Sequence, residues 1–92
     1  MKSFQESLDT AVFTTRFVLE EQSPILVAYH YDDGSWQFSG KEDNLSDEDF
    51  KIISLGEIIE IDKSLLQLSD MPLNSEAKRL SPTSEWRIIV TN

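Results

Sequence analysis

His30 is the only histidine in this 92-residue chain, so any Ser–His–Asp arrangement would have to use it. The G-x-S-x-G turn that carries the serine of many hydrolases is absent. One histidine among scattered carboxylates also lacks the ligand spacing of a zinc site. The chain has no cysteine, which excludes thiolate nucleophiles, zinc–thiolate sites and disulfides. We therefore interpret His30 as a sheet residue and predict a protein that is not an enzyme and holds no metal or cofactor.

Carboxylates are the other groups that could do chemistry, and they concentrate between positions 32 and 49. This segment has one base, Lys41, and a net charge of −6. Its seven acids are Asp32, Asp33, Glu42, Asp43, Asp47, Glu48 and Asp49. Residues 43–49 fail the calcium-loop pattern D-x-[DN]-x-[DN]-G, because Leu45 stands at its third position, where Asp or Asn is required. Three hypotheses remain: a solvated loop, a docking patch for a basic partner, or a small carboxylate-based enzyme in which Asp32 or Glu42 acts without histidine.

The whole chain is acidic, with 17 Asp and Glu against 8 Lys and Arg and a net charge of −9. Such a charge repels the phosphates of nucleic acids and of anionic membranes. It would steer a basic protein partner towards the chain. In the alternative, the chain is a housekeeping or regulatory protein and the charge serves only solubility. The longest apolar run, residues 25–28, is far below the roughly 20 residues of a membrane span, and the lack of cysteine favours the cytoplasm.

Two segments on either side of Asp33-Gly34 have the composition of paired strands. Residues 25–31 and 35–39 are rich in β-branched and aromatic residues, and Asp-Gly is typical of a two-residue hairpin turn. That turn would pair Tyr31 with Trp36 and Tyr29 with Phe38, and would place all four aromatic rings on one sheet face. His30 would then lie on the other face.

The rest of the chain predicts short elements of both kinds. Further strands are expected at 11–15, 51–54 and 85–90. Helical turns are expected at 16–22, after a capping box formed by Ser54 and Glu57, after a cap at Asp62, and at 76–80. Helical spacing places five residues in the core under the sheet: Leu55, Ile58, Ile59, Leu65 and Leu66.

These elements predict one α+β domain over residues 1–92, with residues 1–9 frayed or forming a short helical turn. We expect an antiparallel sheet of about five short strands with two or three short helices on one face. The order of the strands and the oligomeric state stay open.

The order of three motifs resembles that of a known family. They are Trp36-Gln37-Phe38-Ser39-Gly40-Lys41-Glu42, Asp62-Lys63-Ser64-Leu65 and the tail Pro72–Arg79. Over residues 12–80 the chain is similar to a family of short bacterial immunity-protein-like domains, with a W-x-F-x-G-x-E/D hairpin, a D-x-S/E-L helix and a P-x-G-x-x-A/F-x-R tail. The chain departs from the tail at Asn74, where glycine is expected, but Asn tolerates a left-handed backbone.

The resemblance implies a protein that neutralises a partner such as a toxin, and it supplies no catalytic residues. The favoured hypothesis is a non-catalytic, acidic, cytoplasmic binding protein for a basic partner. Its candidate partner-binding residues are the seven acids of segment 32–49 together with Trp36.

Overall fold

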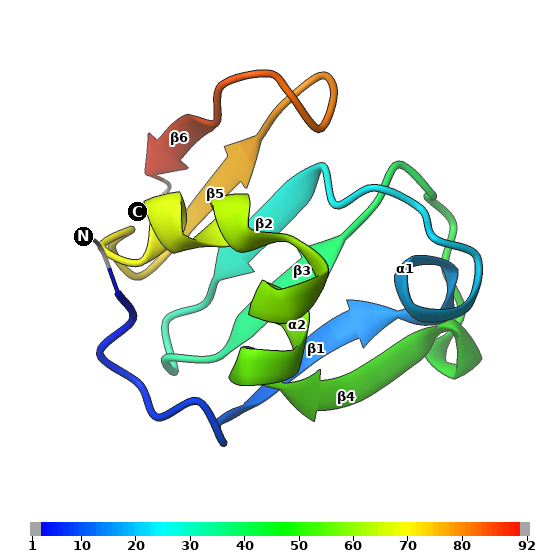
Figure 1. Cartoon of the computed structure of the whole chain (residues 1–92), viewed down its shortest axis with the longest axis horizontal. Helices are drawn as coiled ribbons and strands as arrows, with labels where there is room; N and C mark the ends of the chain where they lie inside the picture. The colour runs from blue at the N-terminus through cyan, green and yellow to red at the C-terminus, as the bar shows by residue number, and fades with distance from the viewer. Residues whose placement is uncertain (1–2, 91–92) are drawn as a thin grey trace.

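Six short strands and four helical segments follow one another along residues 3–90, the part of the chain that the computed structural model describes (Figure 1). In chain order they are β1 (Ala11–Thr15), α1 (Arg16–Glu20), β2 (Val27–His30), β3 (Trp36–Ser39), the 3-10 helix η1 (Asp47–Asp49), β4 (Phe50–Ser54), α2 (Leu55–Ile61), the 3-10 helix η2 (Lys63–Leu68), β5 (Ser75–Lys78) and β6 (Arg87–Val90). They form a small α+β domain of 29 × 28 × 26 Å, which confirms the predicted fold class.

The strands form one mixed sheet in the order β4-β1-β3-β2-β5-β6. β1 runs parallel to β3, whereas the other neighbouring strands are antiparallel. β1 and β3 can run parallel because α1 and β2 separate them along the chain. β2 pairs with the edge of β3 that faces away from β1. The prediction of an antiparallel sheet of about five strands therefore missed one strand and one parallel pairing.

The missed strand is β5, which replaces the helical turn predicted over residues 76–80. Its side chains alternate in burial: Ser75 and Ala77 are buried, whereas Glu76 is half-buried and Lys78 is exposed. This period of two belongs to a strand that pairs on both sides, here with β2 and β6. Asn74, just before β5, has a φ of 58°, so the predicted left-handed turn at this position is confirmed.

One face of the sheet is covered by α2 and η2 (Figure 1). The predicted capping box begins α2, since Ser54 Oγ accepts from Glu57 N at 3.1 Å and the Glu57 carboxylate accepts from Ser54 N. Asp62 caps η2 through Ser64 N. Of the five predicted core residues, Leu55, Ile58, Ile59 and Leu65 are buried, and Leu66 is partly buried against the same cluster.

The turn between β2 and β3 differs from the prediction. Tyr31 N donates to Ser35 O at 2.9 Å and Gly34 N donates to Tyr31 O at 3.0 Å, so the loop has three residues rather than two. Gly34 has a φ of 91°, as expected for the bulge residue of such a loop. Asp33 accepts from the N–H and the hydroxyl of Ser35. This side-chain cap stabilises the longer loop, and the two-residue prediction did not include it.

The longer loop shifts the strand register by one residue, which reverses the predicted faces. Trp36 pairs with His30 instead of Tyr31, and its ring stacks on the His30 ring with centroids 3.8 Å apart. Trp36 and Phe38 point into the core, where they stack on each other at 5.7 Å. Tyr29 and Tyr31 point to the opposite face. The prediction that all four rings share one face is therefore wrong.

The segment before β1 is bound to the core rather than frayed. Phe4 makes an edge-to-face contact with Trp36 at 5.1 Å, and Glu6 accepts a hydrogen bond from Trp36 Nε1 at 2.7 Å. Leu8 O and Thr10 O accept from the first two amides of α2. Residues 1 and 2 lie outside the described part of the chain.

We expect Ile58→Ala to lower the free energy of unfolding by about 2–5 kcal/mol, because this fully buried side chain would leave a cavity between α2 and the sheet. The matched control is Ile52→Ala on β4, whose side chain is 64% exposed and should change stability by less than about 0.5 kcal/mol. Urea denaturation measures both. Equal losses for the two variants would contradict the placement of α2 over the core.

Candidate functional site

The Arg79 guanidinium is the most promising polar group of the interior, because its side chain is almost fully buried. All five of its N–H donors are used. The acceptors are Ile25 O at 3.0 and 2.7 Å, Ser64 Oγ at 2.9 Å, Pro82 O at 3.1 Å, and Asp62 Oδ2. The guanidinium carbon also lies 4.2 Å from the centroid of the Trp86 ring. A guanidinium with no donor left has nothing to offer a ligand, so this cluster is structural.

Asp62 is the acidic partner in this cluster. Burial alone would raise the pKa of its carboxyl, but hydrogen bonds from Ser64 and Arg79, together with the guanidinium charge, lower it further, so the net pKa lies below its usual range. Asp62 thus stays ionised and fixes the end of α2 to the end of β5.

His30 is the second candidate from the sequence, and it is confirmed as a sheet residue at the end of β2. Its Nδ1 lies 2.8 Å from Met71 O, and because a carbonyl only accepts, Nδ1 carries the hydrogen. Its Nε2 lies 3.9 Å from the Glu6 carboxylate, which already accepts from Trp36 Nε1. These contacts hold the ring between the core and the turn before β5. In residues 3–90, no group of His, Asp and Glu side chains is arranged to hold a metal ion.

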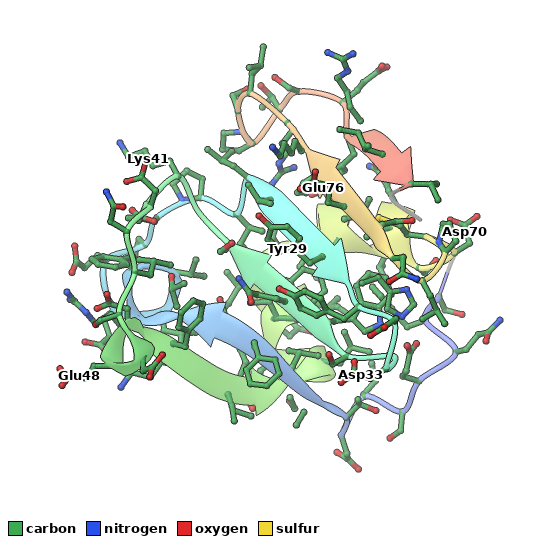
Figure 2. The ribbon with its side chains drawn as sticks, turned by 180° about the vertical axis from the view of Figure 1, so that it is seen from behind. Tyr29, Asp33, Lys41, Glu48, Asp70 and Glu76 are labelled. Carbon is green, nitrogen blue, oxygen red and sulfur yellow. The ribbon has the colours of Figure 1, made fainter. Side chains whose placement is uncertain are left out.

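The acids of segment 32–49 do not form one patch. Asp32 and Asp33 lie on the turn before β3, whereas Glu42 to Asp49 follow β3, so the strand separates the two groups. Figure 2 shows Asp33 at one end of the sheet and Glu48 at the other.

Three of the seven acids are engaged inside the fold. Asp49 Oδ1 accepts from Arg16 Nε at 2.8 Å, and this contact is the main reason that the pKa of Asp49 is lowered. Glu42 Oε2 accepts from Ser23 Oγ at 2.7 Å. Asp33 caps the β2–β3 turn, and the hydrogen bonds from Ser35 lower its pKa.

Four acids are exposed, and their side chains make no hydrogen bond or ion pair with another residue of the described chain. They are Asp32, Asp43, Asp47 and Glu48. Trp36, in contrast, is only 1% exposed and lies in the core, so it cannot contact a partner that docks on the folded surface. Its assignment as a partner-binding residue is corrected for that reason.

The sheet face opposite α2 and η2 is not covered by any element of the described chain. Figure 2 looks onto this face, with Tyr29 and Glu76 near its centre. We call it the open sheet face and define it by residues that point to this side: Phe13, Val27, Tyr29, Tyr31, Gln37, Phe50, Ile52, Glu76, Lys78, Arg87 and Ile89. One row across it runs Ile52, Phe13, Gln37, Tyr29, Glu76 and Ile89, one residue from each strand.

Aromatic side chains make the centre of the open sheet face apolar. Tyr29 and Tyr31 stack with centroids 5.8 Å apart, and Tyr31 Oη donates to Gln37 Oε1 at 3.0 Å. Burial raises the pKa of both tyrosines, so both stay neutral at physiological pH. Phe13 and Tyr31 are each 39% exposed. They are therefore held by their neighbours and still partly accessible to solvent.

A shallow hollow of about 350 Å³ lies within this face. Phe13, Tyr31, Gln37 and Phe50 line it, and Asp47 reaches it from the acidic loop. The structure thus brings one predicted acid next to aromatic residues that the sequence interpretation did not select. Adjacent apolar residues such as Ile52-Ile53 were the sequence signal for this apolar face. Neighbouring residues of a strand point to opposite faces, so one member of each pair must face away from the core.

A scan against protein-family models, a search of curated proteins and a search of solved structures each found no match to this chain. None of the helices within residues 3–90 combines the length and the apolar character required to cross a bilayer.

The ion pair between Asp62 and Arg79 predicts a specific pH dependence. Because the pKa of Asp62 is lower in the folded state than its unfolded value of about 3.9, its stabilisation is present above that pH and is lost as the pH falls through the folded pKa. We expect Asp62→Asn to lower the melting temperature at pH 7 and to flatten its decline between about pH 5 and pH 2. The control is Asp49→Asn, whose loss should matter less because its partner Arg16 is 40% exposed, whereas Arg79 is almost fully buried. Parallel melting curves against pH for wild type and Asp62→Asn would contradict this assignment.

Proposed function

We propose that this chain is a non-catalytic binding protein that docks a basic protein partner on its open sheet face. The observation that carries the proposal is the position of this apolar, aromatic surface, which the chain's own helices leave bare and which lies between two groups of exposed acids. Monomeric proteins rarely leave a contiguous apolar surface uncovered without a binding role.

The two parts of the surface contribute differently to binding. Tyr31 and Phe13 are the anchors, since aromatic side chains carry much of the binding energy at protein interfaces. Their ring faces also attract the Lys and Arg side chains of a basic partner. The exposed acids Asp43, Asp47 and Glu48 act over a longer range and steer the partner during its approach.

The kind of partner follows from the charge and from the resemblance. A net charge of −9 disfavours nucleic acid and anionic membranes, and favours a basic protein in the cytoplasm. The similarity of the three sequence motifs to immunity-protein-like domains supports a toxin as that partner. In this role the chain would neutralise the toxin by covering its basic surface, without any chemical step.

The partner can be identified by comparing what is captured by wild type and by Tyr31→Ala from the native organism. The proposal expects a basic protein that wild type retains and Tyr31→Ala loses, whereas Ile61→Ala, on a side chain that is 49% exposed at the end of α2, retains it. A partner retained equally by all three, or an acidic partner, would overturn the proposal. If the partner is a toxin, its activity should be inhibited by an equimolar amount of the wild-type chain.

With the purified partner, we expect the two groups of residues to affect different rate constants. Tyr31→Ala should speed dissociation by about tenfold or more, because it removes an anchor. Reversal of Asp43, Asp47 and Glu48 to Lys should slow association and flatten its dependence on salt, because steering is screened by ions.

The control for charge reversal compares two single variants, Glu60→Lys on α2 and Asp47→Lys in the acidic loop. Both variants have the same net charge, so they differ only in where the charge is reversed. Glu60 lies on the covered side of the sheet, so its reversal should slow association much less. Surface plasmon resonance at low and high salt measures these rates. Identical association rates for wild type and the triple reversal would leave solubility as the better explanation of the charge.

A further inference from the structure

Three cations gather at one corner of the open sheet face, although the chain as a whole is acidic. Lys78 and Arg87 are paired neighbours on β5 and β6, and Lys41 follows the end of β3. All three line one groove of about 550 Å³, and Glu85 is the only carboxylate among the described residues that line it. Figure 2 shows Lys41 and Asp33 at opposite corners of the face. The open sheet face therefore carries a positive corner.

The groove between these cations has an apolar lining. Val27 lies in the same cross-strand row as Lys78 and Arg87 and forms part of the groove. Leu80, two residues after Lys78, lines it as well, and its side chain is 95% exposed. A partner that covers these two apolar side chains removes apolar surface from water, which favours binding. The corner thus combines apolar contact with positive charge.

The cations of this corner are largely without partners inside the fold. Within residues 3–90, the side chains of Lys41 and Arg87 make no hydrogen bond or ion pair. Lys78 Nζ lies 4.0 Å from a carboxylate oxygen of Glu76, but the lysine side chain is 56% exposed, and such contacts contribute little. Arg79 also lines the groove, but its five donors are already used. The groove therefore offers two cations with free donors and a third that is weakly paired.

A partner bound on the open sheet face has to contact this corner. A protein interface of standard size buries about 800 Å² of each partner. The domain measures 29 × 28 Å across the view of Figure 2, so an interface of that size is about as large as the whole face. Cations that leave water without a counter-charge raise the free energy of the complex, and basic groups placed against them add repulsion. A partner whose net charge is positive therefore needs carboxylates at this corner.

We propose that the basic partner carries a local acidic segment, with an apolar side chain beside its carboxylates, and that this segment occupies the groove. The carboxylates pair with Lys41, Lys78 and Arg87, and the fork of the arginine suits bidentate pairing. The apolar side chain lies against Val27 and Leu80. This inference rests on the proposed function and adds to it the charge pattern of the partner. The positive corner then fixes the orientation in which the partner lies on the face.

The inference predicts an effect opposite in sign to that of the net charge. Neutralisation of Lys78 and Arg87 to Gln makes the chain more acidic, so long-range attraction alone would bind a basic partner more tightly. If carboxylates of the partner occupy the groove, the same change leaves them unpaired and speeds dissociation. We expect Lys78→Gln/Arg87→Gln to dissociate about tenfold or more faster than wild type.

The matched control is Lys51→Gln/Lys63→Gln, which has the same net charge. Lys51 pairs with Thr14, whose side chain is buried, so it points to the helix side of the sheet, and Lys63 begins η2 on that side. This control should dissociate at the rate of wild type. Circular dichroism checks that both double variants are folded, which we expect because all four side chains replaced belong to exposed residues.

Surface plasmon resonance measures these rates with the purified basic protein that wild type captures. Equal dissociation rates for the two double variants, or tighter binding by Lys78→Gln/Arg87→Gln than by wild type, would overturn the inference. In that case the proposed function still stands if Tyr31→Ala loses the same protein. If Tyr31→Ala retains it, the proposed function fails and the inference fails with it.

A second test uses a defined probe in place of the partner. The acidic peptide acetyl-Glu-Leu-Glu-amide is compared with acetyl-Gln-Leu-Gln-amide, which has the same shape and no charge. At about 5 mM peptide, where millimolar affinity is detected, nuclear magnetic resonance should show shifts at Val27, Lys78, Leu80 and Arg87 with the acidic peptide alone. High salt should weaken these shifts. Shifts of equal size with both peptides, or none at the groove, would contradict the assignment.

Discussion

The architecture depends on one buried guanidinium, that of Arg79. It bonds the carbonyl that precedes β2, the carboxylate that joins α2 to η2, and the loop that leads to β6. A buried charge is costly unless every donor is satisfied, and removal of one partner leaves the other uncompensated. The helical layer, the centre of the sheet and the segment before β6 therefore keep their relative positions through a single side chain, and Asp62 supplies the neutralising charge.

This arrangement places both helical segments of the core on the same side of the sheet. The remaining apolar side chains, including Phe13 and Tyr31, are left on a face that the chain itself does not cover. They are held in place by strand pairing and by the stack with Tyr29, so a partner would meet a preformed surface. The domain thus combines a core on one side of the sheet with an uncovered face on the other.

Local signals in the sequence were sufficient to predict those elements whose first and last residues are determined by their neighbours in the chain. Ser54 and Glu57 fixed the start of α2, and the composition of residues 11–15 gave β1 with its exact bounds. Elements that depend on contacts between residues far apart in the sequence could not be predicted from local signals. β5 lacks a strong local preference and is a strand because β2 and β6 flank it.

The same limit applied to the candidate site. Asp33 shifted the hairpin register by a side-chain cap, and this moved Trp36 from the predicted surface into the core. The acidic segment was found from composition, yet the apolar centre that it borders was not. That centre brings together Phe13 of β1, Tyr29 and Tyr31 at β2, and Phe50 of β4, so it exists only once the strand order is known.

The most direct test of the account is a nuclear magnetic resonance titration of the labelled chain with the purified basic protein that it captures. The account predicts that chemical-shift changes and line broadening concentrate on Phe13, Tyr31, Gln37 and Phe50, with weaker changes at Asp47. Changes confined to α2 and η2 would contradict it, because these elements lie on the opposite side of the sheet.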